Sequence, residues 1–551
     1  MLGISIRKES SLGVSETNEG VNVMDFFNKH ILPELQDTNH GNRPVVKATA
    51  LKFVTTFRNQ FSKQELVTLF PMLIAHLGSP VVVVHTFAAF AIERILVTKE
   101  QIGGKQIVFG NAELRPFLEP LLTSLFGIVD NADLNENDYV MKCCMRALAT
   151  AEADVVPITQ IVIEKLTHAL ARVAKNPRNP QFNHFLFESI AVLVRSVCSA
   201  DPDAAPALEA LLFPPFQTVL QMEILEFTPY VFQVLAQLLE LRSTENGIGQ
   251  YQGLFHPLMT PALWERKGNV PALTRLVQAY VMKAAPMIVQ ENRLTGVLGC
   301  FQKLLSYPAH EGDAFNLLNS LTLYIPPEAM NNFNPTIFQL LITGLQNAKQ
   351  SKSSVRFPRF SRHLINFLAL FVAKRNPADF FALLEALQPG SGKMLIAQVW
   401  LPRLQADPPK DLDAKIQVVG LTKLLCETPD LLNDPAGQQL WCALFLSVST
   451  VLAATALAPS SGNVDGEVEG LMAADVQYDS AFTGLIHAKK PKVDPIPEIA
   501  DASTAFAQAM QGFAASRPGR LAPLVQESLK DSDPKLSAGM QALFQQNGVQ
   551  M

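Results

Sequence analysis

The sequence predicts an all-α protein: a right-handed α–α superhelix, or solenoid, built from stacked helix pairs. Apolar residues recur at i, i+3, i+4 and i+7 in segment after segment, which is the spacing of one helix face. Segments of this kind form pairs that repeat every ~40–47 residues, the period of HEAT and armadillo repeats. Strand signals are nearly absent, because no Asn-Gly turn lies between two alternating apolar runs.

The stretch from Lys63 to Val97 illustrates the repeat most clearly. Its first half places five apolar residues on one helix face. Gly78, Ser79 and Pro80 then end this helix, and we expect Pro80 to lie in the first turn of the next. The second helix is apolar almost all round as far as Glu93, so it requires cover on more than one side. A stack of such hairpins supplies that cover. The five apolar residues are Leu66, Leu69, Phe70, Leu73 and Leu77.

The same pairing continues along the chain, with smaller pairs as far as Leu457 and helical signals again from Ala502 to Gln546. The predicted pairs are Val23–Leu35 with Pro44–Phe57, Ala112–Val129 with Asp138–Ala153, Val155–Ala174 with Phe182–Cys198, Pro206–Gln221 with Phe227–Leu241, Leu254–Trp264 with Val270–Ala284, Leu294–Leu305 with Ala314–Tyr324, and Pro335–Gln346 with Phe360–Ala373.

The domain organisation follows from where this pattern stops. We expect residues 1–20 to be disordered or outside the family region, and residues 21–458 to form the solenoid. Residues 459–477 are rich in Gly, Ser and acidic residues and indicate a flexible linker. Residues 478–551 are expected to supply the C-terminal helices that complete the stack, although residues 487–497 are too rich in proline for a helix.

Composition limits the class of protein. The 551 residues are 48% hydrophobic and 17% charged, which excludes wholesale disorder. A net charge of -5 and a pI near 6.1 argue against a phosphate-binding surface across the molecule, so no nucleic acid is expected as a partner. Six scattered cysteines form no C-x-x-C pair, which favours free thiols in a reducing compartment.

No catalytic, cofactor or metal site is predicted, and the protein is not expected to be an enzyme. Residues 389–393 (PGSGK) resemble the end of a P-loop, but the first glycine and the Ser/Thr are missing. The histidines show no H-E-x-x-H and no cysteine partners at zinc spacing. His76, His85 and His184 lie within helix-pair segments and are expected to be packing or capping residues.

Two stretches allow more than one interpretation. Leu440–Ala458 is uncharged and about as long as a membrane span, but it lacks flanking Lys or Arg. A buried helix of the stack is the favoured interpretation, so no membrane insertion is expected. Lys489–Lys492 (KKPK) resembles a short nuclear-localisation run, but an exposed basic loop is the favoured interpretation.

Long stretches of the chain also resemble a known family. They follow in order from about Val21 to Phe544. On these residues the chain resembles the exportins of the importin-β (karyopherin) superfamily, in their C-terminal portion. The stretches are FFNKHILPEL (Phe26–Leu35), PVVKATALKFVTTFRNQ (Pro44–Gln60), VVHTFAAFAIERIL (Val83–Leu96), KNPRNPQFNHFLFESI (Lys175–Ile190), EFTPYVFQVLAQLLE (Glu226–Glu240), LWERKGNVPALTRLVQAY (Leu263–Tyr280), LGCFQKLL (Leu298–Leu305), VVGLTKLL (Val418–Leu425), YDSAFTGLIHAKK (Tyr478–Lys490) and RPGRLAPLVQESL (Arg517–Leu529).

The resemblance implies a HEAT solenoid that binds importin-α as cargo together with Ran-GTP. It also implies shuttling between nucleus and cytoplasm, with transient contacts at the nuclear pore. The family's importin-β N-terminal domain, its main Ran-binding element, has no counterpart in the matched residues. We therefore expect Ran binding to be affected. We also expect the apolar face around Phe26, Phe27, Ile31 and Leu35 to be exposed and the isolated chain to be prone to aggregation. A general HEAT scaffold outside the Ran system is the alternative.

Candidate partner-binding residues are the polar side chains of the second helices, which usually line the concave face of a HEAT solenoid. A basic stripe there would suit acidic patches on importin-α or Ran. Each residue singly is also explained as a solvated helix face or as a pair within the stack. The candidates are Arg58, Arg94, Lys142, Arg146, Glu188, Arg195, Arg266 and Arg275.

Overall fold

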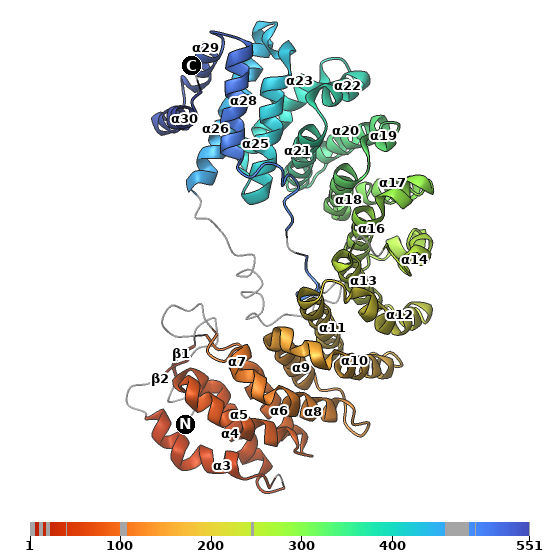
Figure 1. Ribbon diagram of the computed structural model, residues 1–551, viewed down its shortest axis with the longest axis vertical. Coiled ribbons are helices and arrows are strands. Elements are labelled where there is room, and N and C mark those ends of the chain that lie inside the picture. The colour runs from red at the N-terminus through yellow and green to blue at the C-terminus, as the bar shows by residue number, and fades with distance from the viewer. Residues whose placement is uncertain are drawn as a thin grey trace. The chain divides into compact units, whose positions relative to one another are not determined.

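The computed structural model describes residues 6–9, 15–17, 22–39, 41–99, 107–243, 247–457, 484–490 and 492–549. The chain forms two compact units that are discontinuous in sequence. The first unit contains residues 1–252, 266–276 and 465–490, and the second contains residues 253–265, 277–464 and 491–551. In each unit, antiparallel helices stack in pairs, as a HEAT-type solenoid requires (Figure 1).

In the first unit, the second helices of successive pairs form one continuous layer. Helix α4 packs on α6, α6 on α9, α9 on α11, and α11 on α13. The first helices form the other layer, with α5 on α8 and α10 on α12. The helices are α2 (Val23–Phe26), α3 (Leu32–Gln36), α4 (Pro44–Phe57), α5 (Lys63–Leu77), α6 (Val82–Ile95), α7 (Asn111–Leu114), α8 (Leu118–Val129), α9 (Asp138–Ala151), α10 (Thr159–Val173), α11 (Pro180–Ala200), α12 (Ala205–Gln221) and α13 (Thr228–Leu241).

The predicted hairpin over α5 and α6 is confirmed, with one difference at its turn. Ser62 and Glu65 form a reciprocal capping box that starts α5. Pro80 lies in the turn rather than in the first turn of α6, whose N-cap is Val81. The ring of His85 bonds the Ser79 carbonyl at 3.0 Å, which fixes this tight connection.

The apolar face expected to be exposed near residue 26 is instead covered, so this expectation is wrong. Phe27, Ile31 and Leu35 are buried, and Phe26 is half-buried. The Phe27 ring lies edge-on to Phe61 at 4.9 Å between centroids. The physical reason is local: a π-helical turn over Phe27–Ile31 turns these side chains toward the partner helix of their own pair.

The second unit repeats the design. Helix α18 packs on α21, α21 on α25, and α25 on α28, while α20 packs on α22. Two helices begin with residues of the first unit, α14 (Tyr251–Leu258) and α16 (Val270–Gln290). The others are α15 (Pro261–Glu265), α17 (Leu294–Leu305), α18 (Glu311–Tyr324), α19 (Pro327–Met330), α20 (Asn334–Gln350), α21 (Arg356–Lys374), α22 (Pro377–Leu387), α23 (Ser391–Leu395), α24 (Leu401–Ala406), α25 (Asp411–Glu427), α26 (Pro435–Leu457), α28 (Ala502–Ser516), α29 (Leu521–Leu529) and α30 (Pro534–Gln546).

Helix α26 is the long apolar segment that could have been a membrane span. It is the one helix of the described residues long and apolar enough for that role. Its side chains pack against α25, α29 and α30. Trp441 and Phe445 are fully buried, and Trp441 donates its indole N–H to the Leu425 carbonyl at 3.0 Å. Protein therefore covers this helix, as predicted for a buried helix of the stack.

The two ends of the chain differ from the expected organisation. Ile6–Glu9 and Ser15–Thr17 form a two-stranded antiparallel sheet, β1 and β2, within the stretch expected to be disordered. Residues 484–490 and 492–500 contain no helix and precede the C-terminal helices α28 to α30. The predicted linker over residues 459–477 lies outside the described residues.

Candidate partner-binding surface

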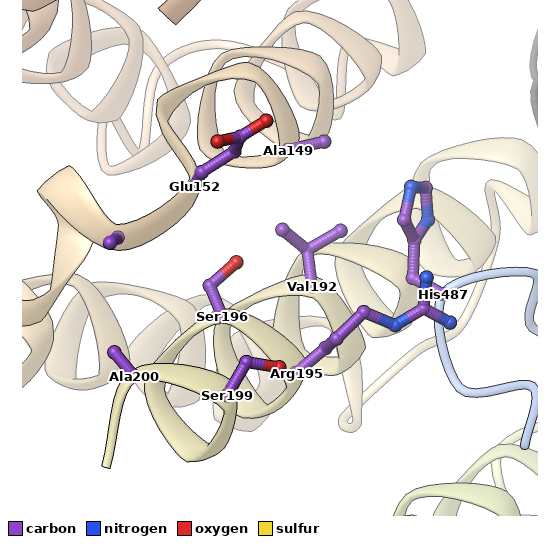
Figure 2. A pocket seen from close by; sticks show the side chains of 9 residues that line it. Ala149, Glu152, Val192, Arg195, Ser196, Ser199, Ala200 and His487 are labelled. Carbon is purple, nitrogen blue, oxygen red and sulfur yellow. The ribbon is translucent and has the colours of Figure 1, made fainter. Parts of the chain in front are cut away.

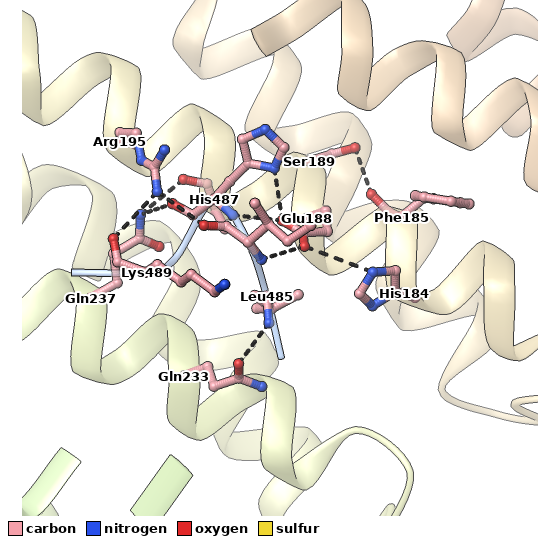
Figure 3. Close-up of polar contacts among 12 residues, drawn as sticks. His184, Phe185, Glu188, Ser189, Arg195, Gln233, Gln237, Leu485, His487 and Lys489 are labelled. Carbon is pink, nitrogen blue, oxygen red and sulfur yellow. Dashed lines mark hydrogen bonds and ion pairs between the residues drawn. The ribbon is translucent and has the colours of Figure 1, made fainter. Parts of the chain in front are cut away.

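The most elaborate polar site of the first unit is built around residues 484–490, which we call the strap. The strap crosses helices α11, α13 and the start of α16 without forming a helix or strand (Figure 3). Its sequence, GLIHAKK, is apolar and small at the centre, and Leu485, Ile486, His487 and Ala488 are all buried. Buried backbone without secondary structure needs side-chain partners for its polar groups.

The N–H groups of the strap are satisfied by α11 and α13. Gln233 accepts from Leu485 N–H at 2.8 Å. The two carboxylate oxygens of Glu188 accept from the N–H groups of Ile486 and His487, at 2.6 and 3.0 Å. One carboxylate thus accepts hydrogen bonds from two consecutive peptide groups. Hydrogen bonds to a charged carboxylate are stronger than those between neutral groups.

The carbonyl groups of the strap are satisfied by three donors. Arg195 donates to the carbonyls of Ile486 and Lys489, at 3.2 and 3.3 Å. Gln237 donates to the His487 carbonyl at 3.1 Å. Arg275 donates to the Ala488 carbonyl and forms a two-pronged ion pair with Glu240 on α13. The helices therefore recognise the main chain of the strap on both its donor and its acceptor sides.

A buried hydrogen-bonded pair lies at the centre of this site. Nδ1 of His487 lies 2.8 Å from Glu188 Oε2, and both side chains are at most 5% exposed. Burial opposes ionisation of Glu188, but the hydrogen bonds that it accepts from His487 hold its pKa below the usual value. An ionised carboxylate only accepts, so His487 Nδ1–H is the donor.

His184 lies on the other side of the same carboxylate, with its Nε2 3.7 Å from Glu188 Oε1. Burial lowers the pKa of His184, and the nearby His487 acts in the same direction, while the Glu188 charge opposes them. Aromatic rings of Phe185 and Tyr230 flank the imidazole. His184 is therefore a packing residue, as the sequence predicted, and His76 likewise caps the Leu35 carbonyl at 3.0 Å.

A second charged group surrounds Glu93 on α6. Arg94 Nε lies 3.3 Å and Arg146 Nε 3.6 Å from the Glu93 carboxylate. Burial lowers the pKa of Arg146, which is about as buried as Glu93 itself. Burial also lowers the pKa of Arg58, and the charge of Arg94 acts in the same direction. This group joins successive second helices of the stack and leaves only Arg94 half-buried.

The eight predicted partner-binding residues therefore divide into distinct environments. Glu188, Arg195 and Arg275 converge on the strap. Arg94 and Arg146 lie beside Glu93, whereas Arg58 lies in a 3-10 turn just after α4 and donates to the Thr55 carbonyl at 2.8 Å. Lys142 on α9 is half-buried with its ammonium 5.5 Å from the centroid of the Phe185 ring. Arg266 is exposed, but it lies between α15 and α16 rather than on a second helix, so its expected placement is wrong.

Three of these residues are too buried for direct contact with a partner. Arg58, Arg146 and Glu188 are each at most 9% exposed, so they do not present their charges to a partner directly. Gln233, Gln237 and His487 also hold the strap but were not among the predicted residues. The available signal was a pair of glutamines at i, i+4 on a largely apolar helix, which indicates that buried polar groups on that face have hydrogen-bond partners.

A cavity of about 410 Å³ lies beside the strap, between the ends of α9 and α11 (Figure 2). Val192 and several alanines form its apolar wall. Arg195, Ser196, Ser199 and His487 supply the polar groups on one side, and Glu152 lies on the other. Nε2 of His487 is buried and has no hydrogen-bond partner. Across the residues described, no group of His, Cys, Asp and Glu side chains could hold a metal ion.

Comparison with known proteins decides the family. The family model of the CAS/CSE protein C-terminus matches residues 93–538, and the Cse1 model matches residues 1–92. This chain belongs to the CAS/CSE family. The Cse1 match begins at residue 1, so the first 20 residues, which we expected to lie outside the family region, fall within a matched family model.

Curated relatives of this CAS/CSE chain are exportins. It is 35% identical to exportin-2 of Mus musculus over 521 residues, which cover 94% of this chain and 52% of the mouse protein. It is also 35% identical to exportin-2 of Drosophila melanogaster over 543 residues, covering 98% of this chain and 54% of the fly protein. The chain thus spans about half the length of the curated relatives that it matches.

Solved structures support the same assignment and confirm the predicted fold class. The exportin Cse1 in its cargo-free, cytoplasmic state matches with a TM-score of 0.78 and 26% identity, over 98% of this CAS/CSE chain and 53% of that structure. Importin β matches with a TM-score of 0.55 and 12% identity, over 94% of this chain and 57% of importin β, which shows the fold alone. The CAS/CSE chain is an all-α, HEAT-type protein of the karyopherin kind.

Proposed function

We propose that this CAS/CSE chain acts in nuclear export, as a receptor or part of one that binds importin-α together with Ran-GTP and returns importin-α from nucleus to cytoplasm. The observation that carries the proposal is its 35% identity to exportin-2 over 94% of its length. In this proposal the chain binds and releases protein partners and performs no catalysis. It shuttles between nucleus and cytoplasm and contacts the nuclear pore transiently.

The proposal assigns the direct contacts to the basic residues that solvent reaches. Arg94 and Lys142 are half-buried on neighbouring second helices, α6 and α9, and Arg266 is exposed. Their positive charge suits acidic patches on a protein partner. Arg195 and Arg275 contribute indirectly, because their hydrogen bonds hold the strap in place. Arg58, Arg146 and Glu188 serve the packing of the helices that present these groups.

Pull-down of importin-α by this chain, with and without Ran locked in its GTP form, tests the proposal. Capture that depends on Ran-GTP is the expected result. Ran-independent capture would contradict the cooperative part of the proposal. Absence of capture in both conditions, from a monodisperse sample, would contradict the proposal for this chain as a whole.

A charge-reversal pair sharpens the test. Lys142→Glu should weaken capture of importin-α or Ran-GTP, because it reverses a charge on the proposed contact layer. Lys52→Glu is the matched control, since Lys52 is an exposed lysine on α4 and is not one of the proposed contact residues. Equal capture by the two variants would remove Lys142 from the contact surface.

A further inference from the structure

A stripe of apolar side chains follows the solvent-facing side of helix α6. Val83, Phe87 and Phe90 recur at i, i+4 and i+7, so they lie along one side of that helix. Val83 is 38% exposed, and both phenylalanines are half-buried. On the neighbouring helix α9, Tyr139 is 43% exposed, and its ring lies edge-on to Phe90 at 5.5 Å between centroids. We call these four residues the α6 stripe.

The α6 stripe is a preformed surface. On the opposite side of α6, Val84, Ala88 and Ile92 are fully buried. The Asn137 side chain, at the N-cap of α9, donates to the Thr86 hydroxyl at 2.6 Å and joins the starts of α6 and α9. The core beneath the stripe therefore holds it in place, while solvent reaches its outer side. Contiguous apolar side chains on such a surface are typical of an interaction site.

Positive charge lies at one end of the stripe. Arg94 continues the row one turn beyond Phe90, and its guanidinium lies 5.2 Å from the centroid of the Phe90 ring. Lys142 lies about one turn beyond Tyr139 on α9, and both cations are half-buried. Helices α4, α6 and α9, with the turn after α4, contain six cationic side chains and two carboxylates. These are Lys47, Lys52, Arg58, Arg94, Lys142 and Arg146, and Glu93 and Asp138.

The Glu93 carboxylate at this end is shared by two arginines. Arg94 Nε lies 3.3 Å and Arg146 Nε 3.6 Å from it. Burial lowers the pKa of Arg146, the charges of Glu93 and Glu188 oppose that shift, and the charge of Arg94 adds to it. Arg94 and Arg146 therefore repel each other, and a further carboxylate beside Arg94 is attracted to both.

The spacing and depth of the stripe select its occupant. From Val83 to Phe90 the stripe spans about 10 Å along α6, which is two turns of helix. A second helix laid beside α6 presents side chains at the same spacing, as amphipathic helices do when they pack on a helical layer. The two phenylalanines are half-buried, so they do not project far enough to enter a lipid bilayer. A protein helix with a carboxylate at its end thus fits better than a membrane surface.

We propose that the α6 stripe binds an amphipathic helix of a partner protein, whose apolar side chains pack on the four residues of the stripe and whose carboxylate lies beside Arg94 and Lys142. This inference deepens the proposed function and rests on it, because Arg94 and Lys142 are contact residues there. It does not depend on which partner supplies the helix. A failed pull-down with importin-α and a failed test with a helical peptide are therefore distinguishable results.

The probe is a fluorescein-labelled, alanine-based helical peptide with leucines at i, i+4 and i+7 and a glutamate one turn beyond each end of the leucine row. One counterpart has lysines in place of the glutamates, and another has the same residues in scrambled order. Fluorescence anisotropy measures binding to the full chain. We expect the acidic peptide to bind at least about tenfold more tightly than either counterpart. Absence of binding by the acidic peptide, or equal binding of any counterpart, would overturn the proposal.

Variants at solvent-accessible positions locate the binding. Val83→Asp should weaken it at least about tenfold, because it places a carboxylate within the apolar contact. Ile161→Asp is the matched control, since Ile161 is 61% exposed on α10, in the layer of first helices, and it should leave binding unchanged. Lys142→Glu should weaken binding of the acidic peptide and strengthen binding of the basic one, a reversal that loss of the fold cannot produce. Equal binding by Val83→Asp and Ile161→Asp would refute the proposed site.

Two further measurements test other occupants of the stripe. Sedimentation velocity of the chain alone tests a second copy, and co-sedimentation with vesicles of phosphatidylserine and phosphatidylcholine tests a membrane. We expect neither a dimer nor vesicle binding that depends on the stripe. A concentration-dependent dimer, or vesicle binding, that Val83→Asp abolishes and Ile161→Asp retains would overturn the proposal and assign the surface to that occupant.

Discussion

The Glu188 carboxylate accepts a hydrogen bond of 2.8 Å from Nδ1 of His487, although 299 positions separate the two residues in the sequence. The same carboxylate also accepts the main-chain N–H groups of Ile486 and His487. One side chain on α11 thus holds three donors of the strap. The position of the strap depends on this residue more than on any apolar contact of comparable size.

Glu188→Gln should loosen the strap. Glutamine is nearly isosteric, but it lacks the charge and replaces one acceptor oxygen by a donor NH₂ that faces existing donors. Charged hydrogen bonds contribute about 1.5–3 kcal/mol each, so amide exchange at Ile486 and His487 should accelerate at least about tenfold. Glu119→Gln, on the exposed side of α8, is the control and should change nothing. Unchanged exchange in Glu188→Gln would show that the strap is held by other contacts.

Arg275→Lys tests the geometry of the donor rather than its charge. Arg275 reaches both oxygens of Glu240 and the Ala488 carbonyl simultaneously, which a single ammonium cannot reproduce. We expect faster exchange or proteolysis near Ala488, with little change in the thermal unfolding of the second unit. Unchanged exchange and proteolysis near Ala488 in Arg275→Lys would show that the planar guanidinium group is not required to hold the strap.

Stability should depend on pH through His184. Burial lowers the pKa of this ring from its ordinary value of 6.5, so the folded chain keeps it neutral where the unfolded chain takes up a proton. The free energy of unfolding should therefore fall as the pH drops below about 6.5, and the contribution is fully present above that value. His184→Phe keeps an aromatic ring between Phe185 and Tyr230 and should flatten this part of the profile. Denaturant titrations at several pH values measure it, and parallel profiles for the two proteins would contradict the assignment.

A glycine fixes the approach of two helices in the second unit. A Cβ at Gly420 on α25 would lie 2.6 Å from the Ala369 carbonyl oxygen of α21. Gly420→Ala should therefore destabilise the unit by about 1–3 kcal/mol, because the backbone has to move. Gly512→Ala on α28 is the matched control, since open space surrounds that position. It should stabilise the helix by about 0.5–1 kcal/mol. Thermal unfolding distinguishes the two signs, and stabilisation by both would show that the helices separate at little cost.

The bounds of the helices could be predicted from the sequence. Each helix has to bury an apolar face, and the spacing of apolar residues along the sequence shows where that face begins and ends. Helix α4 occupies the predicted range Pro44–Phe57, and α17 occupies Leu294–Leu305. The family stretches also pointed to the matched family. The bounds of a helix depend on the spacing of apolar residues within a short stretch of sequence, so the sequence was sufficient to predict them.

The strap could not be predicted in the same way. Leu485 to Ala488 has no periodicity, and its burial depends on Glu188, Gln233 and Arg275, which come from three distant helices. The candidate list likewise identified Arg58 and Arg146 as polar residues of second helices but could not show that neighbouring pairs cover them. The strap site and the burial of these arginines both depend on contacts between segments that are distant in the sequence. The spacing of residues along the sequence does not reveal such contacts.

The long separation between α11 and the strap also sets an order of events during synthesis. A ribosome that adds about 5–20 residues per second needs about 15–60 s to proceed from Glu188 to His487. From the completion of α13 until the strap is made, the Glu188 carboxylate on α11 and the glutamines on α13 still contact water. The binding site for the strap on the nascent chain is therefore unoccupied for nearly half of its synthesis. Any extended peptide with suitably spaced backbone groups competes for that site before the chain's own residues arrive.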